Sequence, residues 1–506
     1  MKSNGSYEIE LLLVNAPGKQ RVYQELAKNL TAYEPPIWAG LAATYARRKG
    51  YVVDILDAEA LQLTLDDMVK EIAARQPLLT AFVVYGQQPS ASTQCMPAAG
   101  AGCRLLKDHH PELKTVFFGT HMSALPHKTL VEEATDFVIQ GEGPSSLDAL
   151  LQALKNHSGS YKGIPGLWYR EDGKVVGNLP ARKIRSLDKE LPGIAWDLLP
   201  MDQYRAHNWH CWDHIEKRQP YASLYTSLGC PHKCNFCCIN APFGGRGIRY
   251  WSPEFVIKEI DHVVNVHGVK NIKIADEMFV LNPRHVLGLA ELIIQRGYDL
   301  NIWAYARVDT IRDRYLDVLK KAGFNWLGIG VESGSKFVRD GVAKGRFGDV
   351  EIRSVINKIR KHGIYVGANY IFGLPDDTLE SMNETLQLAL DLNTEWANFY
   401  STMAYPGSLL HAQAVEEGIM LPESEGGPGW IGYSQHAYET LPLSTLTVSA
   451  GQVLSFRDQA FDRYFTNKSY LNMMEHKFGK KVAEHINKMV SIKLDRKFSE
   501  PFSRCQ

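Results

Sequence analysis

Two regions of this 506-residue chain alternate short apolar runs with amphipathic helical patterns, which limits the folds that the chain can adopt. In the first region, apolar runs that predict buried strands lie at 9–14, 52–56, 79–84, 115–118 and 137–139. Helical patterns lie at 39–48, from Thr64 onward, at 98–107 and at 145–154. Such alternation is typical of a parallel sheet covered by helices on both faces. We therefore predict a doubly wound, Rossmann-like α/β domain of five strands at residues 1–158.

The second region repeats the strand–helix alternation six times. Its strands are expected at 223–226, 271–274, 301–304, 327–331, 365–371 and 396–401. Six units predict a (βα)6 partial TIM barrel at residues 216–425, with catalytic residues at the carboxyl ends of the strands. Between the two regions, an Asp172-Gly173 turn and several prolines predict a hairpin and linker at 159–215. Residues 426–506 are predicted to be helical, with helices at 449–465 and 471–490.

Composition excludes several classes of partner. Lys plus Arg and Asp plus Glu both total 56, so the formal net charge is zero and no nucleic-acid partner is expected. No apolar run reaches about 18 residues, so no membrane span is predicted, and the N-terminus lacks the apolar core of a signal peptide. Four of the eight cysteines lie within positions 230–238. That spacing indicates metal binding in a cytoplasmic protein rather than a disulfide framework.

The cysteine cluster follows the first strand of the predicted barrel. Cys230, Cys234 and Cys237 lie within eight residues on one loop, where three thiolates can hold one iron–sulfur cluster. Three ligands leave the fourth iron of a [4Fe–4S] cluster open to another molecule. The alternative is a zinc site, which normally has four protein ligands. His232 or Cys238 could supply the fourth.

The spacing Cys-x3-Cys-x2-Cys, with Phe236 before the last cysteine, resembles the signature of the radical S-adenosylmethionine (SAM) superfamily. The resemblance implies that the open iron binds the amino and carboxylate groups of SAM, and that one electron from the cluster releases a 5′-deoxyadenosyl radical. Phe236 would then lie near the adenine, and Cys238 would not be a ligand. The later strand ends also resemble the family, which implies SAM contacts for Asp276, Glu277, Arg307, Glu332 and Gly373. The alternatives are a solvated acid for Glu332, a structural salt bridge for Arg307, and no direct role for Asp276 and Glu277.

The first domain resembles the cobalamin-binding domain that precedes the barrel in one class of these enzymes. Doubly wound sheets bind ligands at the carboxyl ends of their strands. The residues that the resemblance implies for cobalamin are Tyr85, Gly86, Gln87, Gly119, Thr120, His121, Gly141 and Glu142. The Asp-x-His-x-x-Gly motif of a lower-ligand histidine is absent. Two hypotheses follow, namely cobalamin bound without a histidine at the usual place, or a degenerate domain without cobalamin. His121 lies in a later loop, where a surface histidine is the ordinary interpretation.

The resemblance implies a cobalamin-dependent radical SAM methyltransferase that uses a [4Fe–4S] cluster, SAM and cobalamin to methylate an unactivated carbon. Its substrate would be a small molecule or natural product, and its electron donor an external protein such as flavodoxin or ferredoxin. One alternative keeps both cofactors without methyl transfer, as in the architecturally similar anaerobic magnesium-protoporphyrin monomethyl ester cyclase. A methylthiotransferase would need a second cluster, for which only Cys95 and Cys103 precede the linker. A cobalamin-binding sensor or carrier is the alternative of another class.

Overall fold

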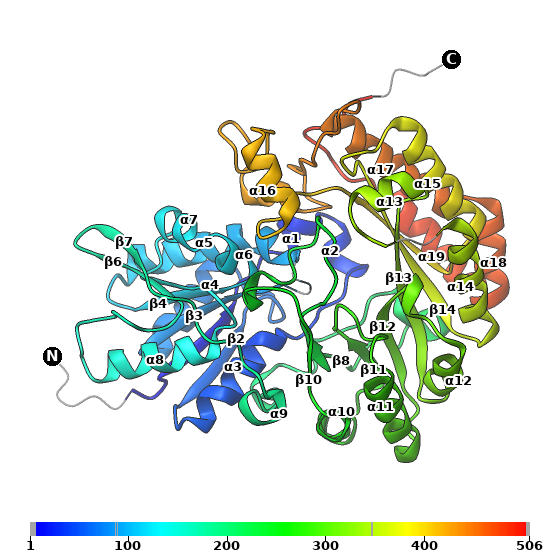
Figure 1. Ribbon diagram of the computed structural model, residues 1–506. Coiled ribbons are helices and arrows are strands. Elements are labelled where there is room, and N and C mark those ends of the chain that lie inside the picture. Colours follow the sequence, from blue (N-terminus) through cyan, green and yellow to red (C-terminus); the bar gives the residue numbers. More distant parts are fainter. Residues whose placement is uncertain (1–6, 87, 89, 346–347, 502–506) are drawn as a thin grey trace.

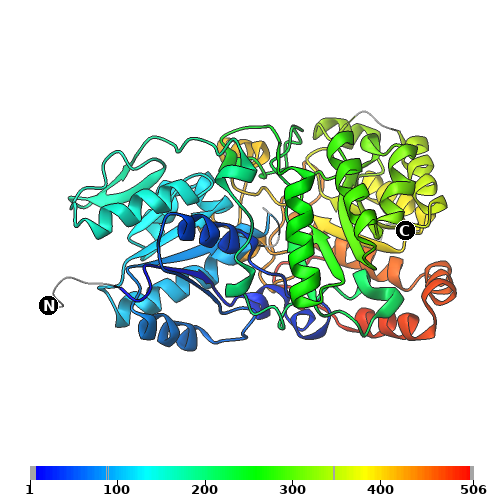
Figure 2. The ribbon, with the colours of Figure 1, turned by 90° about the horizontal axis from the view of Figure 1, so that it is seen from below.

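A computed structural model describes residues 7–86, 88, 90–345 and 348–501. Its two large sheets lie side by side (Figures 1 and 2). The first sheet has the five predicted parallel strands in the order β2-β1-β3-β4-β5. The order changes direction between β1 and β3, which makes the carboxyl ends of these two strands a switch point where ligands bind. The strands are β1 (Leu11–Asn15), β2 (Val53–Asp57), β3 (Leu79–Val84), β4 (Thr115–Gly119) and β5 (Phe137–Ile139).

Helices cover both faces of this sheet, as the alternation predicts. Leu11 and Leu13 of β1 face the core under α3 and α8, whereas Leu12 and Val14 face the core under α4 and α5. The Thr64 side chain caps α4 by accepting the Asp67 backbone N–H at 3.1 Å. The helices are α1 (Lys19–Tyr23), α2 (Leu26–Asn29), α3 (Ile37–Arg48), α4 (Leu65–Arg75), α5 (Ala91–His109), α6 (Thr120–Ala124), α7 (Pro126–Glu132) and α8 (Pro144–Lys155).

The predicted hairpin forms around Asp172 and Gly173, which both have positive φ angles. Its strands are β6 (Leu167–Glu171) and β7 (Lys174–Gly177). The hairpin falls in the predicted linker region 159–215, but β6 pairs antiparallel with β5, and the hairpin completes a seven-stranded first sheet. The pairing gives β5 a partner on its outer side, so the hairpin belongs structurally to the first domain.

The second sheet is the predicted half-barrel of six parallel strands, in the order β8-β11-β12-β13-β14-β15. The strands are β8 (Tyr221–Leu224), β11 (Asn271–Ile274), β12 (Asn301–Arg307), β13 (Phe324–Glu332), β14 (Tyr365–Phe372) and β15 (Trp396–Ser401). Helices lie along its outer face (Figure 1), and they are α10 (Pro253–His267), α11 (Pro283–Arg296), α12 (Asp313–Lys321), α13 (Lys336–Gly341), α14 (Asp349–Lys361) and α15 (Leu379–Leu392). Sequence periodicity missed the short antiparallel pair β9 (Ser227–Leu228) and β10 (Arg249–Tyr250).

The C-terminal region is helical, as predicted, and packs on the barrel near β14 and β15. Its helices are α17 (Ala450–Phe465), α18 (Lys468–Phe478) and α19 (Lys480–Ser491). Gly479 divides the expected second helix into two, because it interrupts the helix with a φ of +85°. The shorter helices α9 (Leu187–Glu190) and α16 (Leu409–Glu416) lie in the connections.

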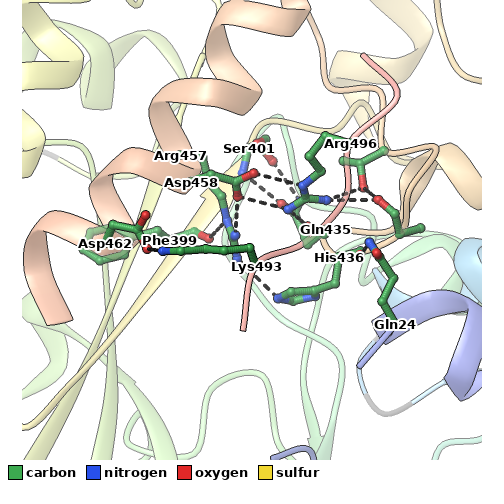
Figure 3. A network of polar contacts seen from close by, with 12 residues as sticks. Gln24, Phe399, Ser401, Gln435, His436, Arg457, Asp458, Asp462, Lys493 and Arg496 are labelled. Carbon is green, nitrogen blue, oxygen red and sulfur yellow. Dashed lines mark hydrogen bonds and ion pairs between the residues drawn. The ribbon is translucent and has the colours of Figure 1, made fainter. Parts of the chain in front are cut away.

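A polar network fastens the C-terminal region to both domains (Figure 3). The Gln435 side chain accepts the Ser401 N–H and donates to the Ser401 carbonyl, each at 2.9 Å, at the end of the edge strand β15. Arg496 donates to the Gln435 carbonyl at 3.0 Å and pairs with Asp458 at 2.9 Å. Gln24 of the first domain donates to the His436 carbonyl at 2.7 Å. None of the described helices combines the length and the apolar character needed to cross a membrane.

Candidate functional site

The cysteine loop connects β9 to β10 at the carboxyl end of the barrel. Gly229 opens it with a φ of +88°, and a Cβ atom there would lie 2.5 Å from the Gly247 carbonyl oxygen, so only glycine fits. The Asn240 side chain forms hydrogen bonds with both the N–H and the carbonyl of Cys230. Its Oδ1 accepts the Cys230 N–H at 3.3 Å and its Nδ2 donates to the Cys230 carbonyl at 3.1 Å. These two bonds tie the backbone of the first cysteine to the segment that follows the last one.

The three predicted ligands are free thiols in this loop. Cys230 and Cys234 are half-buried and Cys237 is exposed. Burial raises the pKa of Cys230 to about 11, and the nearby Glu277 and Cys234 raise it further. In the described part of the chain, no three His, Cys, Asp or Glu side chains converge as around a single ion. A four-iron cubane, which takes its thiolates at separate corners, fits three such neighbours on one loop.

Asp276 lies at the end of β11 and its carboxylate is fully used by neighbours. It accepts the Thr226 N–H, the Thr226 hydroxyl and the Ser227 hydroxyl, each at 2.6 Å. His285 contacts the same Thr226 hydroxyl through Nε2 at 2.8 Å. Burial raises the pKa of Asp276 to about 6, despite these donors. The structure thus places Asp276 where it fixes the strand that leads into the cysteine loop.

Glu277, the next residue, points elsewhere. It lines a small cavity beside Gly229, together with Tyr225 of the barrel and Trp38 and Tyr85 of the first domain. Burial raises its pKa to about 7, and Lys273 opposes that shift. Glu277 is therefore a carboxyl group that can bind a cation or change its protonation state beside the cysteine loop.

Arg307 and Glu332 lie at the ends of neighbouring strands and both are buried. Arg307 points Nη1 at the Cys234 sulfur, 3.7 Å away, and pairs with Asp309 at 2.9 Å. Glu332 has a φ of +68°, a strained conformation for a residue with a side chain, and its Oε1 pairs with Lys344 at 2.5 Å. Backbone strain of about 1–3 kcal/mol is found mostly at functional sites, which favours a ligand-binding role for Glu332.

Gly373 and Phe236 have packing roles in the structure. Gly373 has a φ of +78°, and a Cβ atom there would lie 2.6 Å from Val453 of α17. Its N–H donates to Asp377 at 3.0 Å. Phe236 packs against two small apolar clusters, one of which contains Val342. Both predicted SAM contacts remain predictions.

At the end of β3, Tyr85 stacks on Trp38, with ring centroids 4.3 Å apart, and its hydroxyl donates to the Glu142 carbonyl at 3.1 Å. Gly86 has a φ of +69° and packs tightly against Ala91, which explains the glycine. Gln87 lies outside the described residues. The Tyr85–Trp38 stack therefore lies at the end of β3, where the loop predicted to bind cobalamin begins.

After β4, Gly119 approaches the Val84 carbonyl so closely that no side chain fits. Thr120 and His121 are buried, and the Thr120 hydroxyl and His121 Nε2 find no hydrogen-bond partner among the described residues. The surface position expected for His121 is wrong, because Trp430 of the C-terminal region covers it edge-on at 4.5 Å. Burial lowers the pKa of His121 to about 3, so its ring is neutral at pH 7. These unused polar atoms fit a ligand that is rich in amide groups, as a corrin is.

The β5 loop faces the barrel. Gly141 has a φ of +116° and lies near Pro242 of the cysteine loop region. Glu142 accepts the Ile184 N–H at 2.6 Å and pairs with Arg249 of β10 at 2.6 Å. In this structure Glu142 therefore joins the first domain to the strand that closes the cysteine loop.

A second ion pair between the domains was missed by the sequence-based prediction. Glu34 precedes α3 and Lys273 lies on β11; their charged groups are 2.9 Å apart and both side chains are 2% exposed. A lysine between two isoleucines of a buried strand, Ile272 and Ile274, was the available signal, since buried charges require a partner. The partner itself lies 239 positions away and has no sequence signature.

Comparison with known proteins agrees with both halves of this description. Residues 224–389 match the family model of the radical SAM superfamily, and residues 25–151 match that of the B12 binding domain. An uncharacterised methyltransferase of Pyrococcus horikoshii is 30% identical over 388 residues, which cover 76% of this chain and 80% of the relative. The anaerobic magnesium-protoporphyrin IX monomethyl ester cyclase of Rubrivivax gelatinosus is 25% identical, over 86% of this chain and 75% of the cyclase.

A solved structure shows the same fold over nearly the whole chain. The cobalamin-dependent SAM radical enzyme OxsB, with aqua-cobalamin and SAM bound, superposes with a TM-score of 0.68. The match has 17% sequence identity and covers 95% of this chain and 71% of OxsB. The first sheet, the half-barrel and the C-terminal helices thus form an architecture that is already known.

Proposed function

Because this chain belongs to the cobalamin-dependent radical SAM enzymes, we propose that it methylates an unactivated carbon atom of a small molecule or natural product. One observation carries the proposal. Gly229 and Glu277, beside the cysteine loop, share a cavity with Trp38, Tyr85 and Thr120 of the first domain. Groups held by the two domains therefore face the same space, which a transfer between them requires.

The barrel and the first domain would each hold a different cofactor beside this cavity. When bound, the cluster with SAM supplies a carbon radical and cobalamin supplies a methyl group. Cys230, Cys234 and Cys237 would hold the cluster, and Arg307 would keep positive charge beside Cys234. Glu277, on the same side, would orient the amino group of SAM as a carboxylate.

The ion pairs between the domains hold the two sides together. Glu34 and Lys273 are both buried, and the Glu142 and Arg249 side chains are 6% and 14% exposed, so both pairs connect the first domain to the barrel away from bulk water. The Trp38–Tyr85 stack walls the shared cavity with apolar surface. Apolar walls limit the access of water, which protects a reactive carbon radical from side reactions.

The test is anaerobic turnover of the reconstituted protein with SAM labelled in its methyl group, cobalamin and a one-electron donor such as flavodoxin. We expect 5′-deoxyadenosine and a labelled product that is heavier by one methylene unit. Cys234→Ala should abolish both, whereas Cys211→Ala, which alters a buried thiol remote from the loop, should abolish neither. Absence of 5′-deoxyadenosine from the wild-type protein would remove the radical step, and absence of label in a product would remove the methyl transfer.

A second candidate is supported by the relationship to the cyclase of Rubrivivax gelatinosus. In that case both cofactors would be used without methyl transfer. Product mass separates the two candidates, because cyclisation adds no methylene unit. A sensor or carrier without turnover would give no SAM-dependent change in the electron paramagnetic resonance spectrum of the reduced cluster.

A further inference from the structure

A large cavity lies outside the shared space, at the carboxyl ends of β1 and β2. Its volume is about 740 Å³, which is enough for a small-molecule ligand. The segment that carries α1 and α2 forms one wall, and the first turns of α4 and the middle of α5 form the other. We call it the basic pocket, because its charged lining residues are Lys19, Arg21, Lys28, Glu59 and Arg205.

Positive charge in the basic pocket exceeds negative charge. At its mouth, Arg21 and Lys28 form exposed ion pairs with residues outside the pocket, and such pairs contribute little. Deeper inside, Lys19 is only 7% exposed. The one lining acid, Glu59, already accepts the Gly18 and Lys19 backbone N–H groups at 2.7 and 2.8 Å. The interior thus has two cations, Lys19 and Arg205, and one acid that is already engaged.

Lys19 and Arg205 converge on one ring. The Lys19 amino group is 3.2 Å and the Arg205 guanidinium 4.8 Å from the centre of the Tyr33 ring. Burial lowers the pKa of Lys19 to about 7; Glu59 opposes the shift and Arg205 adds to it. Arg205 Nε is buried and has no hydrogen-bond partner in the part of the chain that the structure describes. A bound anion would balance both cations and would accept from the unused donor.

The basic pocket leads toward the cysteine loop. It shares Lys19, Glu59 and Gln94 with a narrower cavity of about 90 Å³. That cavity in turn shares Trp38 and Tyr85 with the space beside Gly229 and Glu277. The three cavities therefore adjoin one another, from the basic pocket to the proposed reaction site.

We propose that the basic pocket binds an anionic group of the substrate, a phosphate or a carboxylate, and that the substrate is an elongated anion whose reacting end reaches the cavity beside the cysteine loop. The inference rests on the proposed function, for which it names a substrate class. Cobalamin is not the proposed occupant. The residues predicted to bind cobalamin follow β3, β4 and β5, whereas the basic pocket lies at the ends of β1 and β2, toward α4 and α5.

The test measures anion binding to the full chain loaded with cluster and cobalamin. Inorganic pyrophosphate and glutarate are titrated calorimetrically at low salt against wild type, Lys19→Met and Arg205→Gln. We expect wild type to bind at least one of these anions and each variant to bind it about tenfold more weakly, since each loses a charge-assisted contact. Lys70→Gln is the matched control, because Lys70 is 76% exposed on α4 outside the pocket, and we expect unchanged affinity.

Two binding results would overturn the proposal. One is a wild type that binds neither anion, and the other is pocket variants that bind as tightly as wild type. Lys19→Arg and Arg205→Lys retain the charge and should retain most of the affinity, so they replace any variant whose circular dichroism or corrinoid spectrum shows misfolding.

The methyltransferase assignment and the anion site can be refuted independently of each other. A protein that binds pyrophosphate through this pocket but transfers no methyl group would keep the anion site and lose the methyltransferase assignment. A protein that methylates only neutral substrates would refute the substrate class and keep the methyltransferase assignment.

Discussion

Replacing Lys273 by methionine removes the positive half of the ion pair that joins the two sheets. The Glu34 carboxylate and the Lys273 amino group are 2.9 Å apart, and each side chain is 2% exposed. Methionine keeps the length of the side chain and lets it pack, so the main change is an uncompensated carboxylate between the domains. Loss of one partner of such a buried pair destabilises a protein by about 3–5 kcal/mol.

The double variant separates charge from packing. Adding Glu34→Gln to Lys273→Met removes both charges of this pair, and removal of both partners of a buried pair is often nearly neutral. We therefore expect the double variant to recover most of the lost stability. The resulting coupling energy between the two positions should be at least about 2 kcal/mol, whereas residues that do not interact add independently.

Guanidinium unfolding followed by circular dichroism gives these free energies. The matched control is Lys481→Met, which breaks an ion pair with Glu216 whose side chains are 79% and 75% exposed. Its cost should stay below about 1 kcal/mol. If Lys273→Met costs no more than this control, or if the two changes at Lys273 and Glu34 are additive, then the domain contact is hydrated and the argument from burial is wrong.

Three further outcomes are expected. Gly229→Ala should lower the iron bound after reconstitution from about four atoms per chain to below one, because the added methyl group would clash with the Gly247 carbonyl across the loop. Gly268→Ala is the control: open space surrounds Gly268, so this variant should keep the iron. Burial lowers the pKa of His121 to about 3, so the unfolded chain binds a proton at this residue at a higher pH than the folded protein, and the free energy of unfolding falls as the pH is lowered. His121→Gln should therefore reduce this fall, measured between pH 6 and pH 4, by up to about 1.4 kcal/mol per pH unit. Equal slopes of unfolding free energy against pH in wild type and variant would contradict this. Arg496→Met should cost about 1–3 kcal/mol, because Asp458 then keeps only its ion pair with Arg457. It should also speed chymotryptic cleavage within residues 430–448, and unchanged cleavage would count against the network of Figure 3.

Sequence patterns predicted the parallel strands of both sheets because these strands are largely buried on two faces. Such strands appear as short continuous apolar runs, and helical periodicity between them fixes the parallel topology. The pair β9–β10 escaped prediction, since two residues per strand carry no periodicity. The hairpin was recognised by its Asp172-Gly173 turn, but its pairing with β5 depends on tertiary contacts.

The part of the site whose residues lie close together in the sequence was predictable. The three cysteines lie on one loop, so their spacing alone indicated a cluster. Asp276 was identified as a site residue, yet its partners Thr226 and Ser227 lie about fifty positions away, and only the fold shows that it holds the strand before the loop. Glu34 is a similar case, because nothing near it in sequence marks it as the partner of Lys273.

The contact between Gln435 and Ser401 has a consequence for any dissection of this chain. A side-chain amide there occupies the hydrogen-bonding positions that a neighbouring strand would take beside β15. Open edges of this kind attract other edges and promote aggregation. A barrel fragment that ends at residue 425 would expose that edge, so chimeras that exchange the half-barrel between relatives should transfer the C-terminal region with it.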